Sequence, residues 1–368
     1  ALSVSPSAFN TPSNSIIASP SISMVAGGSI YVASTGSISS AGGANTSTSS
    51  AAFGGAAGAM NLQAAGLSIA GNLAAAGGIS SYGLVNAGAG GNVTLQNTLT
   101  TLTINDVNDG QTAGLISGAL LIKNGAGILQ LKGSNSYTGA TNMNAGTIYL
   151  GSAGAIPSTS PVNMLAGTIW DLNGINAIVA NISGAGTIRS SYPGVSNLLT
   201  FGSNNSSTSF SGLIEDGLST LSLYKTGSGT FQPNYANTYS GSTTVGAGTW
   251  IATQTNAFGS NTGGTSVLSG AVAQLRGPLD FGTENFSIAG TGISSNGALQ
   301  VQTGNVTIGG TVTIGSVATT IKVESTSLSL NGNISVPTGA LTYLGTGTTQ
   351  LSISGNTNAA VAEVINGI

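Results

Sequence analysis

The sequence predicts an all-β protein, a right-handed parallel β-helix (β-solenoid) with an irregular N-terminal arm. Two observations carry this prediction. A pattern of spaced Lys, Gly, Tyr and Thr residues occurs twice, 102 residues apart and without a gap between its landmarks. Short apolar runs separated by Gly and Asn also recur along the chain. Such repetition indicates stacked rungs, because a single rung cannot bury its apolar row alone.

Residues 1–27 are expected to form the extended arm. Three prolines lie there among Ser and Asn, with apolar spots at Ile16-Ile17 and Ile22. One interpretation is a loose terminus. The other is a strand that adds to an edge of a neighbouring copy, with Ile16, Ile17 and Ile22 as the self-assembly residues.

Residues 28–368 are expected to form a single elongated β-solenoid. Up to about Ile104, apolar residues come in short pulses such as Leu67-Ser68-Ile69, in which inward and outward positions alternate. Gly and Asn between the pulses supply corners with positive φ. A spacing of roughly 20–30 residues is typical of one solenoid turn. Only the tail from Asn358 has modest helix character, and it either caps the last rung or is a cut end within a longer chain.

The full repeats occupy residues 123–151 and 225–250, and a partial third copy without the Lys occupies residues 343–357. The landmarks of the two full copies correspond at one constant offset. In order, Lys123, Gly125, Gly127, Tyr137, Gly139, Thr141, Gly146 and Thr147 correspond to Lys225, Gly227, Gly229, Tyr239, Gly241, Thr243, Gly248 and Thr249. Internal repetition of this kind fixes an architecture before any local pattern does.

The first copy resembles the autotransporter-associated β-strand repeat of bacterial surface and secreted passenger domains. The second copy is similar, but it has Pro233 and Tyr235 where that repeat has polar strand residues and Gly. The resemblance covers under a third of the chain. It implies a right-handed parallel β-helix and an extracellular location, on the bacterial cell surface or secreted. It implies no catalytic residues.

The composition indicates a folded chain. Disordered chains combine low hydrophobicity with high charge. Here 40% of the residues are hydrophobic and only 4% are charged, which is the opposite combination.

The sparse charge also limits the partners. The first charged side chain is Asp106, so residues 1–105 carry none. The six Lys and Arg residues are scattered, so we expect no nucleic-acid binding and no membrane insertion. With no Cys and no His, we expect no cofactor. A surface of hydroxyl and amide groups suits copies of the same chain, or a neutral surface polysaccharide.

Three close carboxylate pairs are the candidates for acid–base chemistry. Parallel β-helices can host polysaccharide lyases and hydrolases, whose sites need carboxylates on one face. None of the pairs stands beside a recognisable lyase motif, so we expect no catalytic residues. The pairs are Asp106/Asp109, Glu215/Asp216 and Asp280/Glu284.

One turn has the oxygen density of a Ca²⁺ site. Asp106, Asn108 and Asp109 precede Gly110, which lets the chain double back. The turn lacks the bidentate Glu of an EF-hand loop and the repetition of a Ca²⁺-binding β-roll. An ordinary Asx turn is therefore favoured.

The repeat residues and the aromatic residues have structural interpretations and functional ones. We expect Lys123 and Lys225 to extend over the rung edge, with the charge in water. Tyr137 and Tyr239 are expected to pack at equivalent corners. A sugar-binding platform is the alternative for five aromatic residues, which are Trp170, Trp250, Tyr192, Tyr235 and Tyr239.

Three functional hypotheses follow, in order of preference. The first is a non-enzymatic extracellular structural protein that self-assembles into a filament or a surface coat. The second is a monomeric passenger-type surface adhesin, and the third is a carbohydrate-active β-helix enzyme. The absence of His further predicts nearly constant stability between about pH 5 and 8.

Overall fold

A computed structural model describes part of the chain. It gives the backbone of the strands between Ile22 and Ser117, and of residues 350–353 and 362–366. Backbone and side chains are described for residues 120–124, 126–131, 133–315, 317–324, 327–336 and 341–345.

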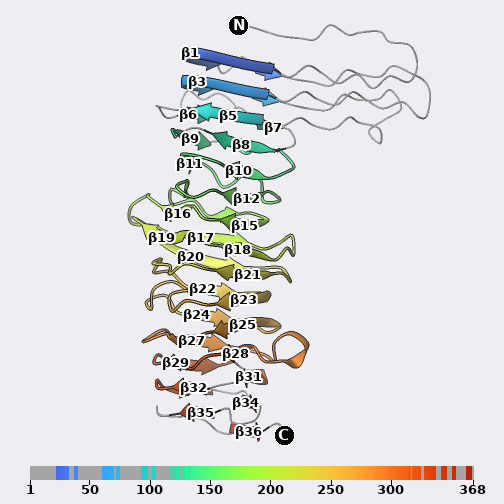
Figure 1. Ribbon diagram of the computed structural model, residues 1–368, viewed down its shortest axis with the longest axis vertical. Helices are drawn as coiled ribbons and strands as arrows, with labels where there is room; N and C mark the ends of the chain where they lie inside the picture. The colour runs from blue at the N-terminus through green and yellow to red at the C-terminus, as the bar shows by residue number, and fades with distance from the viewer. Residues whose placement is uncertain are drawn as a thin grey trace, which may run out of the picture. The chain divides into compact units, whose positions relative to one another are not determined.

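The chain divides into two compact units, Ala1–Asp171 and Leu172–Ile368. Within each unit, parallel strands stack on one another through successive turns (Figure 1). The described residues contain no α-helix, and no helix among them is long and apolar enough to cross a membrane. The predicted all-β parallel β-helix is therefore confirmed.

The strands of the first unit form parallel ladders. One ladder joins β1 (Ile22–Val32), β3 (Met60–Ile69), β5 (Val93–Asn97), β8 (Leu121–Asn124), β10 (Thr141–Met143) and β12 (Pro161–Met164). Another joins β3 to β6 (Leu102–Ile104), β9 (Ile128–Leu131), β11 (Thr147–Leu150) and β13 (Ile169–Asp171). A shorter one joins β2 (Ser37–Ser39), β4 (Asn72–Ala74) and β7 (Ile116–Ser117).

The second unit is built in the same way. One ladder joins β14 (Ala177–Ile178), β17 (Ser196–Phe201), β20 (Thr220–Lys225), β22 (Thr243–Val245), β24 (Thr265–Val267), β27 (Phe286–Ile288), β30 (Val312–Ile314) and β33 (Ile334–Ser335). Another joins β15 (Asn181–Gly184), β18 (Thr208–Phe210), β21 (Thr230–Pro233), β23 (Gly248–Ala252), β25 (Ala271–Arg276), β28 (Leu299–Thr303), β31 (Thr319–Val323), β34 (Leu341–Gly345) and β36 (Ala362–Asn366). Shorter ladders join β16 (Thr187–Ser190) to β19 (Leu213–Gly217), and β26 (Leu279–Asp280) to β29 (Val306–Ile308), β32 (Ser327–Leu330) and β35 (Gln350–Ile353).

Alternation within each strand makes the core. In β20 the side chains of Leu221, Leu223 and Lys225 are buried, while those between them are partly exposed. Each Leu buried in this way stabilises the fold by about 1.5–3 kcal/mol relative to exposure. Stacking then places like positions above one another, so the inward rows merge into one core per unit.

Aromatic rings fill part of the core of the second unit. The ring centroids of Phe201 and Phe231 are 4.7 Å apart, and those of Phe231 and Trp250 are 4.9 Å apart, both edge-on. Phe258 stacks on Trp250 at 5.6 Å. Edge-on pairs are favoured by the ring quadrupole, which adds about 0.5–1.5 kcal/mol beyond the area buried.

Glycine is required where rungs approach closely. Gly248 has φ 66°, and a Cβ there would lie 2.4 Å from the carbonyl oxygen of Gly229. Gly146, its counterpart in the first copy, has φ 73°. The repeated Gly is therefore explained by backbone conformation and by space.

The structure differs from the sequence-based expectations at both ends of the chain. β1 begins at Ile22, inside the expected arm, and Ile22 pairs with Met60 of β3. Ile16 and Ile17 lie outside the described residues. The expected helix character of the tail was wrong, because residues 362–366 form β36, which pairs in parallel with β34.

Candidate interaction surface

One carboxylate of each described pair, Asp216 or Asp280, bonds to the backbone of a turn. Asp216 accepts hydrogen bonds from the backbone N–H groups of Leu221 at 2.9 Å and Ser240 at 3.0 Å. Asp280 accepts one from the N–H of Gly282 at 2.9 Å. Across the described residues, no three Asp, Glu, His or Cys side chains gather as metal ligands would. Asp106, Asn108 and Asp109 lie outside those residues.

Glu284 is separated from Asp280, because its side chain is buried and that of Asp280 is exposed. Its Oε1 accepts a hydrogen bond from the Thr265 hydroxyl at 2.8 Å. Its Oε2 is buried and has no partner among the described residues. Burial raises the pKa of this carboxyl to about 7, with the Thr265 bond acting weakly in the opposite direction.

The two repeat lysines are buried, and the expectation that they extend into water was wrong. Lys123 is 0% exposed and Lys225 is 2% exposed. Each Nζ donates to the carbonyl of the following residue and to one in the next turn. The latter bonds are to Ala145 at 3.1 Å and Ala247 at 2.8 Å. Desolvation lowers the pKa of each lysine to about 8. These side chains tie turns together.

The repeat tyrosines occupy equivalent buried corners, as predicted. Tyr137 and Thr141 share a hydrogen bond between their hydroxyls at 2.6 Å, and Tyr239 and Thr243 share the same bond at 2.6 Å. Burial raises the pKa of both phenols. The corner is a repeated structural element.

Burial divides the five aromatic candidates for a sugar platform. Trp170, Trp250 and Tyr239 are fully buried and cannot touch a ligand. Tyr192 and Tyr235 are exposed. The structure therefore does not bring the five together.

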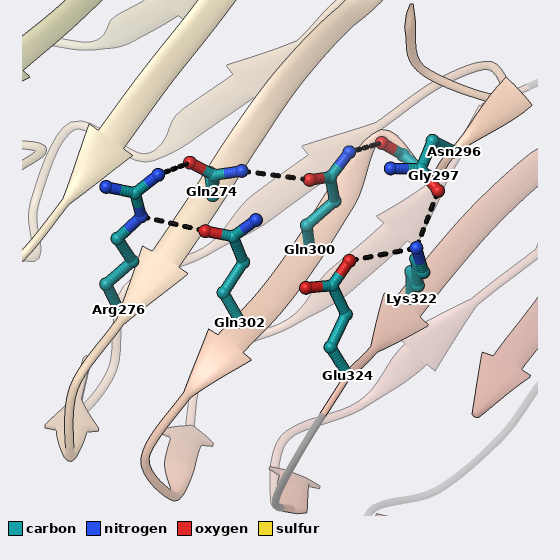
Figure 2. A network of polar contacts seen from close by, with 8 residues as sticks. All are labelled: Gln274, Arg276, Asn296, Gly297, Gln300, Gln302, Lys322 and Glu324. Atoms are coloured by element: carbon teal, nitrogen blue, oxygen red, sulfur yellow. Dashed lines mark hydrogen bonds and ion pairs between the residues drawn. The ribbon is translucent and has the colours of Figure 1, made fainter. Parts of the chain in front are cut away.

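A network of amide and charged side chains covers the outer face of β25, β28 and β31 (Figure 2). Arg276 donates to Gln274 at 2.7 Å and to Gln302 at 2.8 Å. Gln274 donates to Gln300 at 3.1 Å, and Gln300 donates to the carbonyl of Gly297 at 3.1 Å. We call the whole set the amide network, which consists of Gln274, Arg276, Asn296, Gly297, Gln300, Gln302, Lys322 and Glu324.

The network also fastens a loop. Lys322 donates to the side-chain oxygen of Asn296 at 2.6 Å and forms an ion pair with Glu324 at 2.8 Å. Asn296 and Gly297 follow a short 3₁₀ turn, η2 (Ile293–Ser295). The polar groups here bond to one another and to the loop, so the network is structural.

A second outer face has the opposite character. One outward position in each of β17, β20, β22, β24, β27, β30 and β33 carries a hydroxyl group, and these positions align in register. We call them the hydroxyl column, which consists of Thr200, Tyr224, Thr244, Ser266, Ser287, Thr313 and Ser335. Every member is partly or fully exposed. No register shift interrupts the column.

The hydroxyls of this column make no hydrogen bond to any described residue. Their neighbours two positions earlier differ, because several bond to the backbone of the next turn. Ser222 accepts from the N–H of Ser242 at 3.2 Å, and Asn285 accepts from the N–H of Thr311 at 2.7 Å. The row two positions earlier therefore joins turns by hydrogen bonds. The hydroxyls of the column form no such bonds to described residues and remain available to a ligand.

Apolar groups border the column. A Cβ on Gly246 would lie 2.6 Å from the hydroxyl oxygen of Tyr224 and 2.7 Å from its Cζ, so the ring lies along the sheet over Gly246. Ile178, beside Thr200, and Leu198 are exposed on the first strands of the same sheet. The face thus joins free hydroxyls, an aromatic ring and aliphatic side chains without charge.

The sequence carries a partial signal for this column. Most members stand between two buried residues, as in Phe286-Ser287-Ile288, Val312-Thr313-Ile314 and Ile334-Ser335-Val336. Apolar–hydroxyl–apolar triplets mark four of the seven members, Thr200, Ser287, Thr313 and Ser335, whereas Tyr224, Thr244 and Ser266 have a polar or charged neighbour.

Comparison with known proteins confirms the nature of the repeats. The family model described as passenger-associated-transport-repeat matches residues 121–150 and 223–249, which overlap the two full copies almost completely. The adhesin BmaC autotransporter of Brucella suis biovar 1 (strain 1330) is 38% identical over 169 residues. That segment is 45% of this chain and 5% of the relative's length. No solved structure matches the chain.

Proposed function

We propose that this chain, which carries two passenger-associated transport repeats in a β-solenoid, is a non-enzymatic part of a bacterial surface adhesin. The observation that carries the proposal is the coincidence of sequence and geometry. Both matched segments form complete turns, β8 to β11 and β20 to β23, with the same buried Lys and Tyr. The similarity to an adhesin adds the kind of activity.

The described side chains support the non-enzymatic part of the proposal. Asp216 and Asp280 bond to backbone N–H groups of turns, and Glu284 is enclosed in the core. Acid–base catalysis needs carboxylates that reach a substrate together. These three have other structural partners or lie out of reach.

An extracellular location follows from the same proposal. The stacked rungs bury their apolar rows within each unit, and the outer faces are rich in uncharged hydroxyl and amide groups. Such a surface fits a protein that meets neutral polar material outside the cell.

The test is an adhesion assay with the full chain. Beads coated with it should bind to cultured epithelial cells or to deposited extracellular matrix more than beads coated with albumin at the same density. Adhesion equal to the albumin control, together with turnover of a polysaccharide by the same preparation, would favour the carbohydrate-active enzyme instead.

Self-assembly into a filament or coat is the second candidate. The observation that favours it is the absence of charge from residues 1–105, since charge usually keeps exposed edges apart. Sedimentation of the full chain should be compared with that of a chain lacking residues 1–21. This deletion ends just before β1 and leaves that strand intact. If the full chain is a monomer at all concentrations, adhesion by single chains remains as the function. If polymers form only when the deleted segment is present, assembly through Ile16 and Ile17 is supported.

A further inference from the structure

We propose that the hydroxyl column and Tyr224 form a binding face for a neutral polysaccharide chain. This inference rests on the proposed adhesin function and gives it a site and a ligand class. All residues involved lie in the second unit. Every member of the column from β17 to β33 is at least partly exposed.

The first argument is the free bonding capacity of the column. An exposed hydroxyl can both donate and accept. Neighbouring strands lie about 4.8 Å apart, so the Ser and Thr members offer one hydroxyl group per strand at a nearly constant interval, except at β20, where the Tyr224 hydroxyl lies over Gly246 of the next turn. A polymer that carries hydroxyl groups along its length can meet many of them at once. The unbroken register of β17 to β33 keeps the row straight.

The second argument is the aromatic ring within the row. Tyr224 is held flat by Gly246, where any larger residue would displace the ring. A sugar ring has an apolar face of C–H groups and a polar rim of hydroxyls. An aromatic face beside Thr200 and Thr244 matches both parts, because Tyr combines an apolar body with a polar tip.

The third argument is charge. Neither the hydroxyl column nor the row two positions earlier contains a charged residue. Phosphate-bearing polymers need clustered Lys and Arg, which this face lacks. The comparable outward column of the β26 sheet differs, since it begins with Asp280 and carries no aromatic ring before Thr307 and Ser329. That column supplies a matched control.

The experiment uses the full chain in affinity electrophoresis with laminarin, galactomannan or dextran in the gel, and with anionic polygalacturonate as a comparison. At least one neutral polymer should retard the chain more than polygalacturonate does. Tyr224→Ala should weaken retardation about tenfold, by loss of stacking. The pair Thr244→Glu and Ser287→Glu should do the same or more, and the pair Thr307→Glu and Ser329→Glu should leave it unchanged.

The melting temperature of every variant is measured first, and Thr244→Val serves if a Glu variant is unfolded. The proposal is overturned if no neutral polymer binds, or if the two Glu pairs have equal effects. It is also overturned if the Thr244 and Ser287 pair abolishes self-association without any polysaccharide binding, because the face then binds a second copy.

The same preparations are tested in the bead assay, which separates this inference from the proposed function. Adhesion to cells without binding to any neutral polysaccharide removes the inference and leaves the adhesin. Polysaccharide binding without adhesion removes the adhesin and leaves the binding face.

Discussion

The hydroxyl column and the amide network lie on outer faces of the same unit, yet they use polar side chains in opposite ways. In the network, Gln274, Gln300 and Arg276 bond to one another across strands. In the column, Thr244 and Ser287 bond to no described residue. The first face is closed on itself, and the second is open to a partner.

The difference teaches that a polar outer surface on a solenoid is not automatically a binding surface. Amide side chains are long enough to reach the next strand and satisfy each other. A Ser or Thr hydroxyl is shorter and reaches the next turn only where a backbone or amide group lies opposite it, as Ser222 does at the N–H of Ser242. The two faces also differ in burial, because Gln274 and Gln300 are buried, whereas every member of the hydroxyl column is at least partly exposed.

The largest expected effect on stability comes from the buried Glu284, which precedes β27. Only one of its two carboxylate oxygens has a hydrogen-bond partner among the described residues. Its folded pKa of about 7 exceeds the ordinary value of 4.5, so the folded state binds the proton more tightly. The stability from this proton is present at acidic pH and is lost as pH rises through 7. The free energy of unfolding should fall by roughly 2 kcal/mol from pH 5 to 7.5.

Urea denaturation at both pH values measures this effect, and Glu284→Gln should remove it and raise stability at pH 7.5. If the free energy of unfolding of the variant depends on pH as steeply as that of the wild type, Glu284 is not the group responsible. The range stops at pH 7.5 because Lys123 and Lys225, with pKa values near 8, act above it. The sequence-based expectation of nearly constant stability between about pH 5 and 8 therefore needs Glu284 as an exception.

The next effect breaks the amide network. Gln300→Ala should lower the free energy of unfolding by about 1–2 kcal/mol, because Gln274 and the carbonyl of Gly297 lose a partner in a buried setting. Thermal unfolding measures the change. Ser329→Ala is the matched outward control and should alter stability little.

A smaller effect is expected from the ion pair of Lys322 and Glu324. Both side chains are partly exposed, so the pair is screened by water and salt. Lys322→Met should cost at most about 1 kcal/mol. The difference between wild type and variant should shrink at high salt, and a cost that is independent of salt would point to the Asn296 bond instead.

The smallest effect is expected in the column. Thr244→Val should change the free energy of unfolding by less than about 0.5 kcal/mol, because no hydrogen bond within the described chain is lost. The measurement is the same thermal unfolding. A cost comparable to that of Gln300→Ala would show that the column is structural and would end the comparison.

The fold could be predicted from the sequence because rung repetition is local. The constant offset between Lys123 and Lys225, with Gly and Asn between apolar pulses, already required stacking. The burial of those lysines was not foreseeable in the same way. It depends on carbonyls of the next turn, at Ala145 and Ala247, which converge on Nζ only after the turns stack.

The candidate surface was harder to predict because it is a product of register. Successive members of the hydroxyl column are 20 to 26 residues apart, since the loops between strands vary in length. No fixed period connects Thr200 with Thr313. By contrast, the aromatic residues that sequence reasoning proposed for sugar binding included Trp170 and Trp250, which the core required.

The buried Lys225 also bears on how the solenoid grows. Its ammonium is positioned by one turn, through Thr226 and Gly227, and completed by the next, through Ala247. Before the later turn is added, water solvates this ammonium. The later turn removes the ammonium from water, which lowers its pKa to about 8, and supplies the Ala247 carbonyl in exchange, so the two turns are coupled through one side chain. The two turns should therefore exchange their amide hydrogens as one cooperative block.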